Sequence, residues 1–276
     1  MRKTLITALM LTPFVAQAEL VARWDFDSVN DGVFSDRTNT YSGSTDATSV
    51  DGILGDALYF DGTQLATITF PYFPTGDFTV SFWADIDVTI DQGLFSLEND
   101  TGTSHDRHIG VIDSDGYARV WNRESVQTMS KPDYEGDEPI QETYFTIPDD
   151  YSDKQWHQWV MTVEKGVGTS IYIDGHLVSQ RTDIDYSGFD WSENILLGYS
   201  IDVGRHNQEA EGDFSGGFAL GAIDELAIYD TGMTQAEVMA LNDVPSPLVG
   251  LFSLTGIALL LSRKGTRLTW DYFVSP

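Results

Sequence analysis

Two acidic residues, Glu98 and Asp100, are the arrangement in this chain closest to a catalytic carboxylate pair. Glycoside hydrolysis uses two carboxyl groups about 5–10 Å apart. A strand motif of the type Glu-x-Asp-x-Glu would place such groups on one face of a sheet. Here the third acid is missing, because Gly102 and Thr103 stand in its place. In a chain with 43 acidic residues a chance Glu-x-Asp is expected, so this pair does not predict a hydrolase.

Other patterns that could support chemistry are incomplete. His105 and His108 have a spacing that could bind a transition metal, but no third His or Cys accompanies them. The segment Asp113-Ser-Asp-Gly116 has half of a calcium loop and lacks the closing Glu, which favours a simple hairpin turn. The sequence contains no Gly-x-Ser-x-Gly, His-Glu-x-x-His, phosphate-loop or dinucleotide motif. These absences favour a non-catalytic domain.

Aromatic residues in polar segments are the best candidates for binding a ligand. Flat aromatic faces with a few hydrogen-bonding groups are typical of sugar sites. The candidates comprise four rings and two donors: Tyr134, Tyr144, Trp191, Phe214, Arg123 and Arg205. Four more tryptophans occur in strand-like patterns and are expected in the core: Trp24, Trp83, Trp121 and Trp156.

The elements that must position these residues are short strands. Apolar segments of four to eight residues alternate with turn signals, which is typical of a β-sandwich. The predicted strands cover 20–26, 57–60, 65–70, 78–84, two within 109–121, 156–163, 171–173, 176–178, 195–198 and 221–229. The polar residues 29–50 are predicted to be a loop. Asp174-Gly175 predicts a type I′ hairpin turn, in which both residues need positive φ.

Near the end of this region, Thr234 and Glu237 have the spacing of a capping box and predict the start of a helix. There is no internal repeat and no long amphipathic helix, which argues against a solenoid.

The charge of the body limits its partners. The formal net charge of the 276-residue chain is -28. Residues 19–243 hold 42 acidic and 10 basic residues, a balance of 10 − 42 = −32. This argues against nucleic acid or anionic lipid and favours cations or neutral partners such as sugars. The chain has no Cys, so its stability must come from its core or from a metal.

The N-terminus has the three parts of a secretory signal in order. Met1-Arg2-Lys3 is basic, residues 5–15 are mostly apolar, and Ala16-Gln17-Ala18 fits the cleavage pattern. We expect residues 1–18 to be a signal peptide and the mature chain to begin at Glu19.

The C-terminus changes composition sharply after residue 243. Pro245-Ser-Pro247 is followed by an apolar run, 248–261, and by Arg263 and Lys264. This order resembles the PEP-CTERM sorting signal, although Ser246 replaces the usual Glu and residues 265–276 form a further short tail. The resemblance implies exosortase-type processing of a segment over 244–264 and release to the surface or medium. The alternative is a plain membrane anchor, because the apolar run approaches the length needed to cross a bilayer.

Seven segments of the body occur in a characteristic order. They are Trp24-Asp-Phe-Asp27, Ala57-Leu-Tyr-Phe-Asp-Gly62, Phe78-Thr-Val-Ser-Phe-Trp83, Trp156-His157, Ile171-Tyr-Ile-Asp-Gly175, Ile195-Leu-Leu-Gly198 and Ile223-Asp-Glu-Leu-Ala-Ile-Tyr229. Together they resemble a laminin-G-like domain over residues 20–242. The resemblance implies an all-β, concanavalin A-like jelly-roll sandwich of two antiparallel sheets. The chain departs from the family in long polar insertions at 123–155 and 199–216.

The resemblance also implies a structural Ca²⁺ ion. Its ligands would come from the opening segment, the Phe-Asp-Gly turn and the Ile-Asp-Glu strand, which here supply Asp25 or Asp27, Asp61 with Gly62, and Asp224. Calcium prefers carboxylate and carbonyl oxygens. The alternative is that each Asp only closes a turn or caps an element.

The leading functional hypothesis is a secreted or surface-held bacterial lectin-like domain over residues 19–243. It would bind a carbohydrate or another component of the cell surface or matrix, and contact the membrane only through its C-terminal segment. A polysaccharide hydrolase or lyase on the same fold is one alternative. A structural envelope or matrix protein without a ligand is the other.

Overall fold

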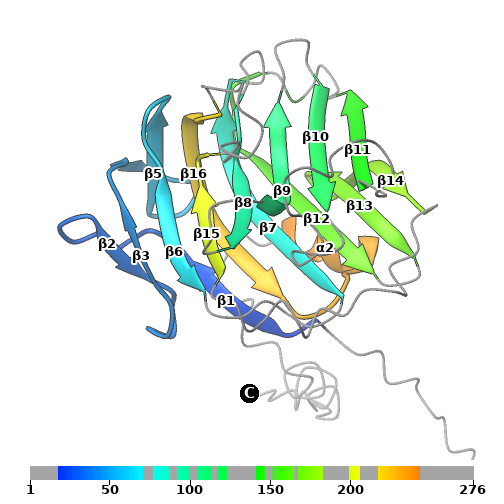
Figure 1. Ribbon diagram of the computed structural model, residues 1–276, viewed down its shortest axis with the longest axis horizontal. Helices are drawn as coiled ribbons and strands as arrows, with labels where there is room; N and C mark the ends of the chain where they lie inside the picture. The colour runs from blue at the N-terminus through cyan, green and yellow to red at the C-terminus, as the bar shows by residue number, and fades with distance from the viewer. Residues whose placement is uncertain are drawn as a thin grey trace, which may run out of the picture.

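The protein is a sandwich of two antiparallel β-sheets (Figure 1). The computed structural model describes residues 18–70, 77–87, 92–99, 105–112, 117–122, 141–146, 151, 153–164, 167–182, 199–205 and 217–242. Sheet A has the order β14 (His176–Arg181), β13 (Gly168–Ile173), β12 (His157–Glu164), β7 (Phe78–Ile86), β16 (Leu220–Tyr229), β5 (Asp56–Asp61) and β4 (Thr48–Asp51), with β1 (Leu20–Trp24) also paired to β16. Sheet B has the order β11 (Gln141–Thr146), β10 (Tyr117–Asn122), β9 (His105–Ile112), β8 (Phe95–Asn99), β15 (Tyr199–Val203), β6 (Ala66–Phe70), β3 (Ser42–Thr45) and β2 (Val33–Ser35).

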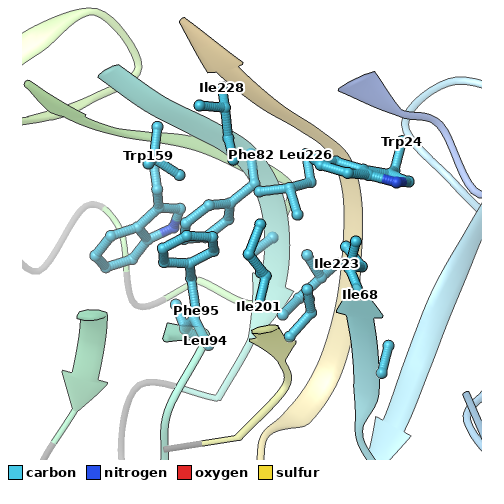
Figure 2. Close-up of a cluster of buried hydrophobic side chains, with 14 of the residues drawn as sticks. Trp24, Ile68, Phe82, Leu94, Phe95, Trp159, Ile201, Ile223, Leu226 and Ile228 are labelled. Carbon is cyan, nitrogen blue, oxygen red and sulfur yellow. The ribbon is translucent and has the colours of Figure 1, made fainter. Parts of the chain in front are cut away.

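The core lies between the two sheets and is built by alternation along each strand. In β7, Phe78, Val80 and Phe82 point inward and are at most 1% exposed. Figure 2 shows Phe82 against Trp159 from β12 and Phe95 from β8. Because successive side chains of a strand face opposite sides, one apolar set per sheet fills the space between the layers. The predicted jelly-roll sandwich is confirmed.

A short helix, α2 (Gln235–Asn242), covers part of the outer face of sheet A. Its contacts form a second buried apolar cluster: Val160, Tyr172, Ala227, Tyr229, Met233 and Val238. The predicted capping box starts this helix. The Thr234 N–H donates to Glu237 Oε2 at 2.8 Å, and the Glu237 N–H donates to Thr234 Oγ1 at 3.4 Å.

The hairpin predicted at Asp174-Gly175 is confirmed. These residues join β13 to β14 and have φ of +49° and +74°, as a type I′ turn requires. The prediction of a loop at 29–50 was wrong, because β2, β3 and β4 lie there. Two of these are edge strands, β2 of sheet B and β4 of sheet A. An edge strand with an exposed outer face can be polar, so its sequence resembles that of a loop.

The tryptophans that are buried differ from those predicted to be in the core. Trp24 is fully buried as expected, whereas Trp83 and Trp156 are only half-buried. The second buried tryptophan of the described core is Trp159, which is 1% exposed. Within the described ranges, no helix has the length and apolar character needed to cross a bilayer. Residues 1–17 and 243–276 lie outside those ranges, so the signal peptide and sorting signal stay predictions.

Candidate functional site

The partners of β16 change halfway along the strand. It pairs with β5 as far as Ile223 and with β1 from Leu226 onward. On its other side it pairs with β7, with a bulge between Asp224 and Ala227. Within this bulge Glu225 has φ of +56°, which is uncommon for a residue other than glycine. Two consecutive acidic residues therefore lie where β5 gives way to β1.

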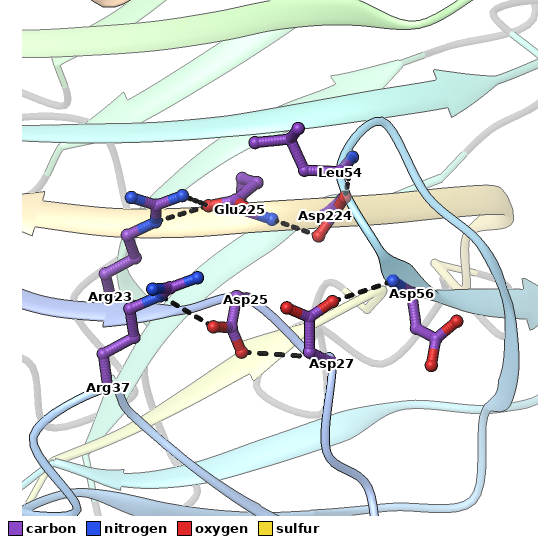
Figure 3. Close-up of polar contacts among 8 residues, drawn as sticks. All are labelled: Arg23, Asp25, Asp27, Arg37, Leu54, Asp56, Asp224 and Glu225. Atoms are coloured by element: carbon purple, nitrogen blue, oxygen red, sulfur yellow. Dashed lines mark hydrogen bonds and ion pairs between the residues drawn. The ribbon is translucent and has the colours of Figure 1, made fainter. Parts of the chain in front are cut away.

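Asp224 is fully buried, and two backbone amides hold its carboxyl group (Figure 3). The Leu54 N–H donates to Oδ2 at 3.2 Å, and the Glu225 N–H donates to Oδ1 at 2.7 Å. Burial raises the pKa of Asp224 to about 8; the Leu54 N–H offsets part of this, and the charge of Asp27 adds to it. Asp224 therefore holds a proton at neutral pH unless a cation lies beside it.

The segment from Gly52 to Gly55 lies directly against two carboxyl groups. A Cβ added to Gly52 would come within 2.5 Å of Asp224 Oδ2, and one added to Gly55 within 1.9 Å of Asp27 Oδ1. Asp27 Oδ1 also accepts the N–H of Asp56 at 2.9 Å. Only glycine leaves room at these two positions. The turn thus brings together Asp27 from the start of the domain and Asp224 from its last strand.

Two arginines neutralise the neighbouring acids. Arg23 forms an ion pair with Glu225, in which the side chains are 11% and 7% exposed. Arg37 Nε lies 2.7 Å from Asp25 Oδ2 (Figure 3). Among the described residues, no ion pair includes Asp27 or Asp224. Those two are therefore the carboxyl groups of this region that still need a positive partner when ionised.

Asp61 and Gly62 do not lie in this cluster. Asp61 ends β5 and pairs with Leu220, whereas Asp224 lies four residues farther along β16. At about 3.3 Å per residue, the two positions are about 13 Å apart along the sheet. Asp61 Oδ1 instead closes a local turn by accepting the N–H and the hydroxyl of Thr63. The structure therefore brings together Asp27 and Asp224, with Asp25 beside them.

The surroundings of Asp27 and Asp224 fit a hard cation. In the described part of the chain, no group of three or more His, Asp or Glu side chains is arranged to hold a metal. An ion here would rely on two carboxylates completed by main-chain oxygens of the Gly52–Gly55 turn and by water. Calcium accepts such mixed oxygen ligands, because it takes six to eight of them. Its charge would offset the repulsion between the two acids.

A row of polar residues crosses the outer face of sheet B. Backbone register aligns Thr67 of β6 with Asp202 of β15, and Asp202 with Ser96 of β8. Across β9, β10 and β11 the same register continues at His108, Trp121 and Glu142. Thr67 is half-buried, Asp202 is 6% exposed and Ser96 is fully buried. The row therefore passes from an open part of the face near β3 to a covered part over β8.

Asp202 is the ionisable residue at the centre of this row. Thr67 Oγ1 donates to its Oδ1 at 2.9 Å. Burial raises the pKa of Asp202, and the Thr67 hydroxyl and the Arg205 charge offset this only in part. Sequence reasoning missed Asp202 because β15 lies inside the predicted polar insertion at 199–216. The alternation of Ile201 and Val203 with polar neighbours was the signal that could have found it.

The predicted ligand-binding residues are spread along sheet B. Tyr144 lies in β11 opposite Arg119, and only its backbone is described. Arg205 follows β15, and its guanidinium lies 5.1 Å from the Phe218 ring centroid. These strands are four positions apart in the sheet, which is about 19 Å. The other candidates lie outside the described residues: Arg123, Tyr134, Trp191 and Phe214.

His157 bridges two carboxylates at the start of β12. Its Nδ1 lies 2.7 Å from Asp174 Oδ2, and its Nε2 lies 2.9 Å from Asp153 Oδ1. Burial by itself would lower the pKa of His157, but the hydrogen bonds to Asp174 and Asp153 outweigh it and raise the pKa. Only the imidazolium can donate from both nitrogens. His157 therefore links the start of β12 to the turn between β13 and β14 through Asp174.

We expect His157→Gln to remove a pH-dependent part of the stability. Because the folded pKa is raised, the stabilisation is fully present below about pH 6.5 and is lost as pH rises through the folded value. The free energy of unfolding should differ from wild type by about 1–3 kcal/mol at pH 5.5 and by less at pH 9. Denaturant titrations at both values measure this. The exposed His176→Gln is the control, and an equal difference at both pH values would contradict the assignment.

Comparison with known proteins places this fold in a family. The sequence profile described as Laminin_G_3, concanavalin A-like lectin/glucanases superfamily, matches residues 60–239. The chain belongs to this family. The Laminin_G_3 match covers β6 to β16 and the first part of α2, and it includes Asp202 and Asp224. No curated protein sequence matches the chain.

Solved structures share the Laminin_G_3 fold at low sequence identity. Domain 4 of AbnA, a GH43 extracellular arabinanase from Geobacillus stearothermophilus in complex with arabinotriose, is 20% identical with a TM-score of 0.58, covering 82% of this chain and 100% of that one. The binding domain of Paraclostridial Mosquitocidal Protein 1 is 16% identical (TM-score 0.56, covering 81% and 52%). The binding domain of botulinum neurotoxin DC, in complex with rat synaptotagmin II, is 12% identical (0.56, 82% and 51%). The chain thus spans about half of each toxin domain.

Proposed function

We propose that this protein is a secreted or surface-held, non-catalytic domain that recognises a neutral carbohydrate across the outer face of sheet B. The observation that carries the proposal is the polar row that begins at the half-buried Thr67 and at Asp202 and that backbone register continues, through the buried Ser96, to His108 and Trp121. Residues of these types are the ones that sugar sites combine. Such a row across neighbouring strands suits an extended ligand.

Two further facts support a neutral saccharide. The net charge of -28 disfavours an anionic polysaccharide, because the whole body would repel it. The arabinanase domain of the same fold was solved with arabinotriose. At 20% identity this likeness extends to the fold alone, so arabinotriose is a first probe and not an assigned ligand.

We also propose that Ca²⁺ stabilises the domain through Asp27 and Asp224. Both carboxyl groups lie against the Gly52–Gly55 turn, and Asp224 is fully buried. A bound ion would join the segment that follows β1 to the last strand, β16, and so provide a cross-link in a chain without Cys. The ion would have a structural role, and no step of ligand recognition depends on it.

A glycan array with arabinotriose and neutral oligosaccharides tests the carbohydrate proposal. Wild type should bind, and Trp121→Ala and Tyr144→Ala should each weaken binding by about 1–3 kcal/mol, by analogy with stacked bases. Met239→Ala removes an exposed apolar side chain of α2 and is the matched control. Absence of binding by folded wild type to every glycan, or normal binding by both ring variants, would contradict the proposal.

A hydrolase is the second candidate, because Asp202 and Glu98 occupy diagonal positions on paired strands. Glu98 pairs with Ser200, two residues from Asp202. The backbone positions of diagonal neighbours are about 7–8 Å apart, a spacing from which two carboxyl groups can reach the separation of an inverting pair. A raised pKa of Asp202 would suit a general acid. An assay for new reducing ends separates the two functions: recognition alone predicts none, and hydrolysis predicts release that Asp202→Asn abolishes.

A further inference from the structure

The outer face of sheet A has two unlike halves. One half is covered by α2 through the apolar cluster that includes Val160, Ala227 and Val238. The other half carries side chains that point away from the core, because they alternate with the buried Phe82, Ala84 and Ile86 of β7. Only this second half remains without a covering helix among the described elements.

Backbone register gathers three aromatic residues on this half. In β7, Trp83 pairs with Gln158 on one side and Asp224 on the other. Asp85 of β7 pairs with Ala222, which pairs with Tyr59 of β5. Since His157 pairs with Ala84, the preceding residue Trp156 is level with Asp85. We call Trp83, Trp156, Tyr59, Asp85 and Gln158 the sheet A platform.

The rings of the platform are partly open to solvent. Tyr59 is 37% exposed, and Trp83 and Trp156 are half-buried. Ala222 lies between Asp85 and Tyr59, and its side chain is too small to cover the neighbouring rings. Half-open indole and phenol rings on a rigid sheet are stacking surfaces with little entropy to lose on binding.

The platform also holds polar groups that need partners. Gln158 is 3% exposed, and its buried Oε1 has no hydrogen-bond partner among the described residues. Asp85 is half-buried beside it. Of the charged groups that act on Asp85, Lys154 is paired with Asp87, while His157 and Asp153 are paired with each other.

This charge pattern selects the chemistry of the ligand. Carboxyl and amide oxygens accept hydrogen bonds, and the cations nearby are already paired with carboxylates. A phosphate, sulfate or uronate would meet repulsion from Asp85 and Asp153. A neutral sugar is complementary to this surface. Its C–H faces can pack on the aromatic rings, and its hydroxyl groups can donate hydrogen bonds to the carboxyl and amide oxygens.

We propose that the sheet A platform is a second saccharide-binding site, so that one domain holds two neutral glycan segments on opposite faces and cross-links them. This inference rests on the proposed carbohydrate recognition by sheet B. It gives the domain a role in a matrix that a single site would not provide, because cross-linking needs two sites that can be occupied together.

Isothermal titration with arabinotriose, and with the neutral oligosaccharide that gives the strongest array signal, tests the second site. Wild type should bind two equivalents. Trp156→Ala and Asp85→Asn should each weaken one of the two at least tenfold, and Trp121→Ala should weaken the other. Met239→Ala should leave both unchanged. Circular dichroism and melting curves verify that each variant is folded, and Trp156→Ala leaves unchanged Trp83, which pairs in register with Asp224.

The outcomes separate the two proposals. If folded wild type binds neither probe, both fail. One equivalent that is lost in Trp121→Ala but kept in Trp156→Ala and Asp85→Asn overturns the platform and leaves recognition by sheet B standing. Two equivalents, together with polysaccharide gelation or precipitation that either single-face variant abolishes, support cross-linking.

Discussion

Calcium should raise the melting temperature of this domain by about 5–10 °C at pH 8, and Asp224→Asn should abolish that response. A ligand that binds only the folded state at a hundredfold excess over its Kd stabilises by about 2.7 kcal/mol, and each kcal/mol moves the melting point of a domain this size by about 2–4 °C. The ion would share its charge between Asp27 and the buried Asp224.

In the absence of a metal ion, the stability of the folded protein should fall as pH rises. The pKa of Asp224 is raised to about 8 in the fold from a usual value of 3.8. Between these values the folded state holds a proton that the unfolded state has lost, so stability falls as pH rises from about 4 to about 8. Asp224→Asn imitates the protonated acid and should stabilise the chelated protein at pH 8. Calorimetry with excess chelator, repeated with excess calcium, measures both effects.

Two control variants sharpen this test. Asp31→Asn changes an exposed acid outside the cluster and should keep the full calcium response. Asp61→Asn should also keep it, because Asp61 closes a turn about 13 Å away along the sheet. Loss of the response in Asp61→Asn would restore the larger ligand set that the resemblance implies. Identical wild-type melting curves with calcium and with chelator would refute the site.

Trp24→Ala should destabilise the domain by about 3–5 kcal/mol, the usual cost of deleting a large buried aromatic side chain. Trp24 is fully buried, its Nε1–H donates to the Tyr41 carbonyl at 3.2 Å, and its ring meets Phe70 edge-on with centroids 6.0 Å apart. The variant loses the packing, leaves a cavity between the sheets and removes one hydrogen bond to the Tyr41 carbonyl, which still accepts the Asp36 N–H. Urea denaturation followed by circular dichroism measures the difference.

Trp24→Phe is the matched comparison, because it keeps most of the volume and loses the hydrogen bond. It should cost less than Trp24→Ala. Met239→Ala, at a site that is 47% exposed, should change stability by no more than about 0.5 kcal/mol. Equal stabilities for Trp24→Ala and wild type would mean that β1 does not contribute to the core as the structure shows.

Local sequence patterns predicted the features that depend on near neighbours. The alternation of Phe78, Val80 and Phe82 predicted β7, because a strand turns every second side chain to one face. Asp174-Gly175 predicted its hairpin, and Thr234 with Glu237 predicted the start of α2. Each pattern spans two to five residues, so its structural meaning is carried by the backbone geometry of that segment alone.

Local sequence patterns did not predict the polar strands. β3 and β4 were assigned to loops because most of their residues are Ser, Thr, Asp or Gly, β2 because it is only three residues long, and β15 because it lies inside the polar insertion at 199–216. Because β15 was not predicted as a strand, the polar row through Asp202 could not be recognised. The sequence also placed Trp83 and Trp156 in the core, but they are only half-buried. Trp156 and Trp159 lie in one strand-like segment, and only the direction of each side chain separates them.

The sequence by itself determined an acidic, Cys-free sandwich of antiparallel sheets with a capped final helix. Only the tertiary structure decided which acids meet. Asp27, the Gly52–Gly55 turn and Asp224 converge because β16 exchanges β5 for β1 at a bulge, and the neighbouring Asp25 is held by Arg37. Asp61 was excluded by its distance along β5. Contacts between residues about 200 positions apart depend on strand order and register, which local patterns do not encode.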